Sequence, residues 1–320
     1  MLPPKDSLTI CFAHAAYQLQ QRFTARLPAI KSFEVRNRSD LDGCIGEADV
    51  LVISGLWHDG LLTKATRLRY IQSIGAGVDQ FPRSQLAERR IRLASAQGVN
   101  ARAVAEHAMA LVLAIARKLP EACRNQTNKV WRGMIGDVTR REDELGGKTL
   151  LVVGLGGIGG RLAQLARAFD MRVIGIRKHP AAREGVEVHG TDALHRLLPE
   201  ADFVVLTIPL TTETEKLIDA QALRCMQPTS YLINVARGRI VDEAALVIAL
   251  REQRIAGAGI DVAVEEPLPP ASLLWDLPNV LITPHTAGET RRYEDNVLAI
   301  LEENLERLWR GEVALKNQIV

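Results

Sequence analysis

A glycine-rich turn between a strand and a helix constrains the fold of this chain more than any other feature. Residues 154–159 read Gly-Leu-Gly-Gly-Ile-Gly, which is the GxGxxG pattern. Residues 150–153 before the turn are apolar and β-branched, as in a buried strand, and residues 161–166 after it begin a helical pattern. This order predicts the first strand, phosphate-binding turn and helix of a dinucleotide-binding α/β unit.

Each glycine of the turn has a separate physical reason. Gly154 permits the tight turn, Gly156 lets the backbone come close to a pyrophosphate, and Gly159 lets the helix pack closely on the strand. The helix N-terminus adds amide donors and a positive dipole end. A glycine turn without a ligand is the alternative. The predicted cofactor-binding turn consists of Gly154, Gly156, Gly157, Ile158 and Gly159.

Two cations follow the second strand of this unit. In a site that prefers NAD(H), an Asp or Glu about 20 residues after the turn holds the ribose 2′-hydroxyl. Here that position is Arg177, followed by Lys178. Two cations suit a 2′-phosphate, so the sequence favours NADP(H), with NAD(H) as the alternative. Arg177 and Lys178 could also be plain solvated charges at a strand end.

Short β-branched runs alternate with helical patterns along the chain, which is typical of parallel sheets covered by helices. We therefore predict an α/β fold with two parallel sheets. The apolar spacing over residues 102–118 predicts a long helix, and that over 289–309 predicts an amphipathic one. Further helices are expected to start near residues 158, 192 and 242. The expected strands are 8–13, 50–54, 70–74, 91–95, 149–153, 172–176, 203–208, 231–235, 259–262 and 280–283.

Charge and composition exclude several classes of protein. The chain has 40 Lys and Arg against 38 Asp and Glu and no long basic stripe, so we expect no nucleic-acid partner. Its longest uncharged apolar stretches, 108–116 and 149–160, are shorter than the roughly 18 residues of a membrane span, so we expect no membrane segment. The N-terminus lacks the pattern of a signal peptide, and we expect a cytoplasmic location. The four cysteines form no zinc spacing, and no metal site is predicted.

Three segments with polar side chains follow strands of the second sheet. Arg237 comes after strand 231–235, Glu266 after strand 259–262, and His285 after strand 280–283. Carboxyl ends of parallel strands meet at one crevice, which is where ligands bind in open α/β sheets. An arginine, a carboxylate and a histidine beside a nicotinamide suit a 2-keto acid: Arg for the carboxylate, His for the carbonyl proton, and Glu to orient the His.

Several motifs in order along the chain carry a family resemblance. They are Gly75-Ala76-Gly77-Val78-Asp79, Gly98-Val99-Asn100 with Ala105-Glu106-His107, the GxGxxG turn, Pro209-Leu210-Thr211, residues 234–238, Asp261-Val262 with Glu266-Pro267-Leu268-Pro269, and Pro278-Asn279-Val280 with Thr283-Pro284-His285. The chain resembles the D-isomer-specific 2-hydroxyacid dehydrogenases, which include glyoxylate and hydroxypyruvate reductases, over nearly its whole length.

The resemblance implies NAD(P)H-dependent reduction of a small 2-keto acid of the glyoxylate or hydroxypyruvate type to its D-2-hydroxy acid. It implies a catalytic set of Arg237, Glu266 and His285, with His285 as the acid and base. The nicotinamide side would be formed by Pro209, Ala236, Asp261 and Gly288. The substrate side would be formed by Gly75, Ala76 and Gly77, whose backbone amides face the substrate carboxylate, together with Trp57, Arg237 and His285.

The resemblance also implies how the chain is divided. Residues 1–101 and 286–320 would form a substrate-binding domain, and residues 102–285 a dinucleotide-binding domain inserted between them. The helix from residue 102 would contribute to a homodimer interface.

Alternative functions remain open at this point. Formate oxidation is disfavoured because there the histidine's partner is typically an amide, whereas here it is Glu266. A phosphoglycerate dehydrogenase with a C-terminal regulatory domain is disfavoured because the chain ends at Val320. A non-enzymatic, dinucleotide-sensing protein of the same fold is the alternative from another class. His107 on the long helix is assigned a structural or interface role, and His58 lies in a loop from which a side chain could reach the substrate.

Overall fold

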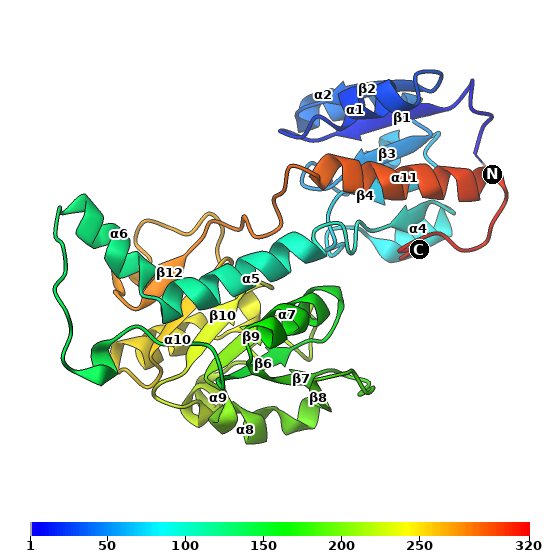
Figure 1. Ribbon diagram of the computed structural model, residues 1–320. Coiled ribbons are helices and arrows are strands. Elements are labelled where there is room, and N and C mark those ends of the chain that lie inside the picture. The colour runs from blue at the N-terminus through cyan, green and yellow to red at the C-terminus, as the bar shows by residue number, and fades with distance from the viewer. Residues whose placement is uncertain (1) are drawn as a thin grey trace. The chain divides into compact units, whose positions relative to one another are not determined.

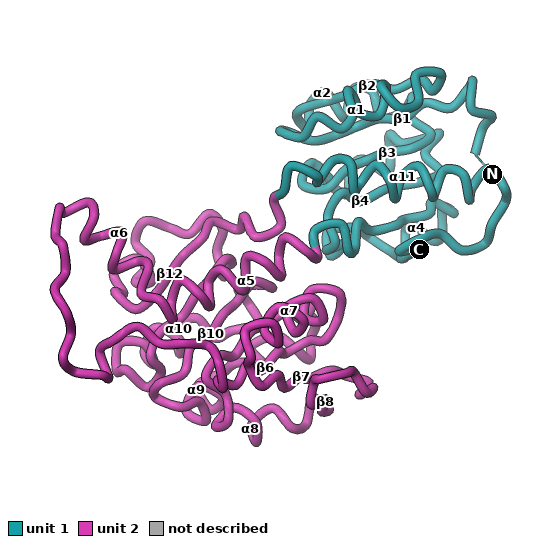
Figure 2. Tube along the Cα trace, viewed as in Figure 1, with its two compact units in different colours: residues 1–100, 290–320 teal, residues 101–289 magenta. Residues whose placement is uncertain are grey.

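The computed structural model describes residues 2–320 and has two compact units (Figure 2). Unit 1 contains the residues up to 100 together with 290–320, and unit 2 contains 101–289. The borders expected after residues 101 and 285 thus stand after 100 and 289 in the structure. Unit 2 is an insertion in the chain of unit 1, which the C-terminal segment completes.

Five parallel strands form the sheet of unit 1, in the spatial order β2-β1-β3-β4-β5 (Figure 1). This is the order of flavodoxin-like sheets. The strands are β1 (Thr9–Ala13), β2 (Lys31–Val35), β3 (Val50–Ile53), β4 (Tyr70–Ser73) and β5 (Arg92–Ala94). Alternate residues of each central strand point to opposite faces, and both faces are buried under helices.

Helices cover both faces of this sheet. Helices α1 (Leu19–Arg26) and α11 (Tyr293–Trp309) share one apolar cluster with β1 and β3. The other face is covered by α2 (Arg38–Cys44), α3 (Leu61–Lys64) and α4 (Arg83–Glu88), with a 3-10 turn at Ile45–Glu47. The predicted amphipathic helix is therefore α11, and it begins at Tyr293 instead of residue 289.

Seven parallel strands form the sheet of unit 2, in the order β12-β11-β10-β9-β6-β7-β8. They are β6 (Thr149–Val153), β7 (Arg172–Ile176), β8 (Glu187–His189), β9 (Phe203–Leu206), β10 (Tyr231–Asn234), β11 (Gly257–Ile260) and β12 (Val280–Ile282). The connections diverge between the neighbours β6 and β9, where an open α/β sheet binds its ligand. The prediction of an α/β fold with two parallel sheets is confirmed.

The helices of unit 2 also lie on both faces. Helices α5 (Ala101–Ala116) and α7 (Gly157–Ala168) pack on one face, and α8 (Leu194–Leu197), α9 (Ala220–Cys225) and α10 (Glu243–Arg251) pack on the other. Helix α6 (Leu119–Thr127) follows α5. Short 3-10 turns occur at Val138–Arg140, Thr191–Ala193, Leu198–Glu200, Gly238–Ile240 and Leu273–Asp276. Between residues 2 and 320, no helix has the length and apolar character needed to cross a bilayer.

The long helix predicted over 102–118 is shorter in the structure. It ends at Ala116, and Lys118 has a left-handed backbone with φ +50°. Pro120 then lies in the first turn of α6, where the missing proline N–H has no helical partner to lose. The helix expected near residue 192 is only a 3-10 turn followed by the one-turn α8.

Candidate active site

The glycine turn after β6 has the geometry that the pattern predicts. Gly154 has φ +109°, and a Cβ there would lie 2.5 Å from Ile208 Cγ2. A Cβ at Gly159 would lie 2.0 Å from the Gly154 carbonyl oxygen, so only glycine allows this close packing. In contrast, a Cβ at Gly156 would have nothing within 4 Å. The backbone at Gly156 therefore faces open space, as a pyrophosphate contact requires.

Thr207, directly after β9, holds this turn in place. Its Oγ1 donates a hydrogen bond to the Gly154 carbonyl at 2.7 Å. Sequence reasoning missed Thr207, although its place at the end of the strand beside β6 was a usable signal. With a fixed turn and the N-terminus of the 12-residue helix α7 behind it, this end of the sheet fits a dinucleotide.

Arg177 and Lys178 are exposed directly after β7. Among the described residues, no carboxylate lies within salt-bridge distance of either side chain. The loop that follows adds a cation that sequence reasoning missed: a Cβ at Gly160 would lie 2.1 Å from Arg183 Nη1, so this guanidinium rests on the first turn of α7. The pKa of the Glu213 carboxyl is lowered by a hydrogen bond from the Thr211 hydroxyl, then by one from its own backbone amide, and to a lesser degree by the charge of Lys178.

The loop after β10 presents Arg237. The buried Asn234 shapes this loop, because its side-chain oxygen accepts from the Ala236 amide at 3.0 Å and its Nδ2 donates to the Arg237 carbonyl at 3.0 Å. The Arg237 guanidinium donates from Nη1 to the Ala236 carbonyl at 2.7 Å. Its other donors have no partner among the described residues.

Gly238 brings the loops after β10 and β11 into contact. A Cβ on Gly238 would lie 2.0 Å from the carbonyl carbon and oxygen of Ala263. The same loop after β11 positions Glu266, whose Oε1 accepts from the Ala263 amide at 3.0 Å. Only glycine therefore allows the backbone that precedes Glu266 to pack on the backbone that follows Arg237.

His285, after β12, pairs directly with Glu266. The distance between His285 Nδ1 and Glu266 Oε2 is 2.6 Å. The side chains are 47% and 38% exposed, so the pair is open to a ligand. Because Glu266 occupies Nδ1, the ring nitrogen left for a substrate is Nε2. The structure thus brings together His285 and Glu266, and places Arg237 on the adjoining loop.

Asp261, which directly follows β11 and is 2% exposed, organises the turn that carries His285. Its carbonyl accepts from the His285 amide at 2.8 Å. Its carboxylate accepts from the Thr286 and Ala287 amides, each at 3.0 Å. Sequence reasoning placed Asp261 beside the cofactor and did not foresee these contacts.

The remaining predicted residues lie in two places. Pro209, Ala236 and Gly288 follow β9, β10 and β12 in unit 2. In unit 1, the Gly75 amide donates to Ser73 Oγ at 3.2 Å, whereas the amides of Ala76 and Gly77 have no partner among the described residues. Trp57 is only 5% exposed, packs on Phe81 with ring centroids 4.9 Å apart, and its buried Nε1 has no partner within residues 2–320.

Comparison with known proteins identifies the family. Residues 109–287, more than half of the chain, match the model described as D-isomer specific 2-hydroxyacid dehydrogenase, NAD binding domain. The chain belongs to the D-isomer specific 2-hydroxyacid dehydrogenase family. Its cofactor is accordingly a nicotinamide dinucleotide, and the family predicted from the motifs is confirmed.

Relatives of this dehydrogenase cover nearly all of it. Glyoxylate/hydroxypyruvate reductase B of Pectobacterium carotovorum subsp. carotovorum (strain PC1) is 36% identical over 300 residues, covering 92% of this chain and 91% of that protein. The solved structure of a D-isomer specific 2-hydroxyacid dehydrogenase family protein from Aeromonas salmonicida subsp. salmonicida A449 has TM-score 0.86 and 31% identity, covering 98% and 99% of the two chains. A D-isomer specific 2-hydroxyacid dehydrogenase from Xanthobacter autotrophicus Py2, in complex with NADPH and MES, has TM-score 0.81 and 29% identity, with 98% of each chain covered.

Proposed function

We propose that this dehydrogenase reduces a small 2-keto acid of the glyoxylate or hydroxypyruvate type to its D-2-hydroxy acid. The observation that carries the proposal is the 2.6 Å pair of His285 and Glu266 at the carboxyl edge of the dinucleotide-type sheet. The name of the Pectobacterium relative, a glyoxylate/hydroxypyruvate reductase, supports this substrate class.

In the proposed reaction the bound nicotinamide supplies a hydride to C2 of the keto acid. Negative charge then develops on the carbonyl oxygen, and a protonated His285 delivers a proton to it from Nε2. Glu266 holds the opposite nitrogen, which orients the ring and stabilises the imidazolium. Arg237 would hold the substrate carboxylate through its free donors, because a guanidinium fork fits a carboxylate in two-pronged fashion.

Unit 1 is proposed as the substrate-binding domain and unit 2 as the dinucleotide-binding domain. Of the loop Gly75-Ala76-Gly77, the amides of Ala76 and Gly77 are the donors available to a substrate carboxylate, since Ser73 takes that of Gly75. Trp57 is proposed as a wall of the substrate site through its indole ring, which packs on Phe81; its Nε1 is buried and is not offered as a contact to the substrate.

NADPH is proposed as the preferred cofactor. Arg177 and Lys178, directly after β7, form no salt bridge with any residue of 2–320, and Arg183 lies on the first turn of α7. Three cations near the expected ribose favour a 2′-phosphate over a 2′-hydroxyl. The proposed contacts to the rest of the cofactor come from the glycine turn and from Pro209, Ala236, Asp261 and Gly288.

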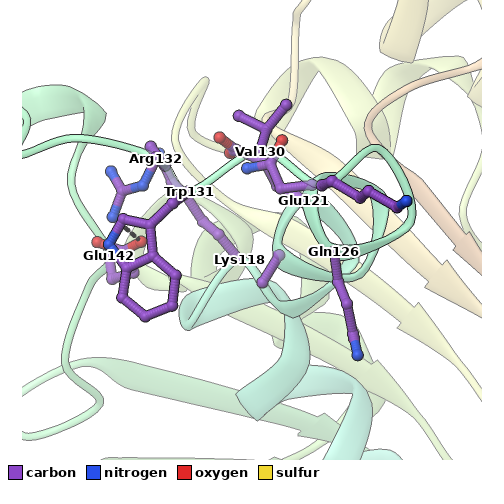
Figure 3. Close-up of a pocket in the computed structure, with 10 residues that line it drawn as sticks. Lys118, Glu121, Gln126, Val130, Trp131, Arg132 and Glu142 are labelled. Carbon is purple, nitrogen blue, oxygen red and sulfur yellow. Dashed lines mark hydrogen bonds and ion pairs between the residues drawn. The ribbon is translucent and has the colours of Figure 1, made fainter.

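A homodimer is proposed from the segment 130–138, which follows α6. Trp131 is 98% exposed and Met134 is 104% exposed, and Val130 and Val138 of the same segment are also exposed. A cavity of about 600 Å³ lies between this segment and α6, lined in part by Lys118, Trp131 and Glu142 (Figure 3). Apolar surface of this kind marks a protein interface. A second copy is the occupant that the family resemblance implies.

Initial rates test the proposed activity. The purified chain is mixed with NADPH or NADH and with glyoxylate, hydroxypyruvate, pyruvate or 3-phosphohydroxypyruvate, and absorbance at the nicotinamide band is followed. We expect rapid NADPH oxidation with glyoxylate and hydroxypyruvate, and D-glycerate as the product from hydroxypyruvate. Preference for 3-phosphohydroxypyruvate would instead favour a phosphoglycerate dehydrogenase-like enzyme. Tight NADPH binding with no turnover of any keto acid would favour the dinucleotide-sensing alternative.

A further inference from the structure

A hydrogen-bonded chain of three side chains links α5 to the turn that carries His285. His107 Nε2 lies 2.9 Å from Thr283 Oγ1, and Thr283 Oγ1 lies 2.6 Å from Asp261 Oδ1. His107 belongs to α5, Thr283 follows β12, and Asp261 follows β11. Three elements far apart in sequence therefore meet through these side chains.

The donors in this chain follow from proton counting. A threonine hydroxyl has one hydrogen, and an ionised carboxylate can only accept. The hydrogen of Thr283 therefore goes to Asp261, and Thr283 Oγ1 must accept from His107. This assigns the hydrogen of the His107 ring to Nε2, which also lies 3.6 Å from Asp261 Oδ1.

The position of Asp261 in turn decides the backbone at His285. Three successive amides, those of residues 285, 286 and 287, donate to Asp261 oxygens. His285 has φ +55°, a left-handed backbone that a non-glycine residue keeps only where its surroundings over-determine it. Rotation of the Asp261 carboxylate would release the amides of Thr286 and Ala287, the two residues that directly follow His285 in this turn.

We propose that His107 is a positioning residue for the acid His285, acting through Thr283 and Asp261. The His107 N–H orients the Thr283 hydroxyl, and this hydroxyl orients the Asp261 carboxylate. The carboxylate then holds the turn that keeps His285 against Glu266. The chain crosses from unit 1 to unit 2 after residue 100, at the start of the helix that carries His107. It returns to unit 1 after residue 289, shortly after the turn that carries His285. The proposal rests on the proposed function of His285, and it goes beyond a packing role for His107.

Two variants at one position separate positioning from packing. His107→Leu keeps apolar bulk and removes the donor, whereas His107→Gln keeps an N–H near the position of Nε2. We expect kcat for glyoxylate reduction to fall about tenfold or more in His107→Leu, with a smaller change in KM for NADPH, because only one of the proposed cofactor contacts, Asp261, is affected. In His107→Gln we expect most of kcat to return. Equal losses in the two variants would overturn the proposal, because packing alone would then explain them.

A double-mutant cycle tests whether His107 acts on the pair of His285 and Glu266. In a Glu266→Gln background, His107→Leu should lower kcat much less than it does in the natural chain, because the His285–Glu266 pair that it positions is already weakened. Fully additive losses would contradict the route. If His107→Leu does not fold, Thr283→Val and Thr283→Ser make the same comparison at the next link, with the hydroxyl absent in one and present in the other.

A spectroscopic readout is independent of turnover. In protein with nitrogen-15 histidine, the ring signals of His285, assigned with His285→Ala, report which nitrogen holds the hydrogen. We expect the Nδ1–H form in the natural chain and in His107→Gln, and a mixture of tautomers in His107→Leu. Unchanged His285 signals in His107→Leu would overturn the proposal even if no 2-keto acid were reduced. Absence of turnover in the natural chain would count against the proposed function alone.

Discussion

His285 combines an unfavourable backbone conformation with the proposed role of the acid. Its left-handed backbone is unusual for a residue with a Cβ, and contacts from Asp261 and Glu266 hold it there. His285→Ala should reduce turnover in the reductive direction by about 10²–10⁴-fold, because proton delivery is lost. NADPH affinity, measured by fluorescence titration, should survive. Near-normal turnover in His285→Ala would rule out this residue as the acid.

Glu266→Gln should have a milder effect than His285→Ala. Glutamine keeps the shape of the side chain but offers the imidazolium no negative charge. The imidazolium that acts as the acid should therefore be stabilised less, and kcat for glyoxylate reduction should fall, though by less than in His285→Ala. Initial rates measure this, and an unchanged kcat in Glu266→Gln would remove Glu266 as the partner that stabilises the acid.

Arg177 provides the residue-scale test of cofactor preference. Replacing a charge-assisted phosphate contact with a neutral side chain should cost about 1.5–3 kcal/mol, or roughly tenfold to a hundredfold in affinity. Arg177→Ala should therefore raise KM for NADPH far more than KM for NADH. Arg224→Ala, which removes an exposed cation at the last turn of α9, is the matched control and should change neither. Equal or better use of NADH by the natural chain would contradict the preference.

At the scale of elements, Gly238 couples two loops that carry catalytic candidates. A methyl group there would overlap the backbone of Ala263, and neither backbone can yield as a flexible side chain could. Gly238→Ala should separate the Arg237 and Glu266 loops, at a cost of about 1–3 kcal/mol in stability. It should lower kcat/KM more than Gly43→Ala, where a Cβ meets nothing within 4 Å. Denaturant unfolding and initial rates measure both effects.

The connection from β1 to α1 depends on a neutral histidine. His14 Nδ1 accepts from the amides of Ala16 and Tyr17, each at 3.0 Å. Burial, and then the charge of Arg36, lower the pKa of His14, against a smaller opposing effect of Glu294. The unfolded chain therefore binds more protons than the folded one once pH falls through about 6.5. The contribution of neutral His14 to the free energy of unfolding should therefore be complete above this pH and should decline below it.

A comparison of variants isolates this contribution. In His14→Gln, the loss of unfolding free energy between pH 8 and pH 5.5, measured with denaturant, should be smaller than in the natural chain. His179→Gln, a change at an exposed histidine after β7, serves as the control. An identical pH dependence in all three proteins would show that His14 does not contribute.

The elements that sequence reasoning found and missed differ in burial. Central strands such as Leu-Leu-Val-Val of β6 are apolar on both faces, so their composition alone predicts them. The edge strands β2 and β8 are half-exposed and read as polar loops. The helix predicted to end at Lys118 ends at Ala116, and the helix α6 that follows the left-handed Lys118 was not predicted.

For the whole molecule, the order of strands and motifs along the chain predicted the place of the candidate site better than any local pattern did. Arg237, Glu266 and His285 follow three strands that pair side by side, so parallel topology alone places them at one edge. Hydrogen-bonded chains such as His107, Thr283 and Asp261 could not be predicted, because they join residues up to 176 positions apart through side-chain orientation. The packing of Gly238 on Ala263 could not be predicted either, because it joins two loops that are separate in the sequence.

The assembly of the molecule is the last property that can be tested. The Trp131 indole is 98% exposed and Met134 of the same segment is equally exposed, which is costly in water unless another surface covers them. We expect light scattering to give twice the 35.2 kDa of one chain. Trp131→Asp should shift the mass toward 35.2 kDa, because a charge would then have to be buried without a partner. Val313→Asp, at a residue that is 90% exposed in unit 1, should leave the mass unchanged. A natural chain that is monomeric at micromolar concentration, or a Trp131→Asp variant that stays dimeric, would remove this segment as the interface.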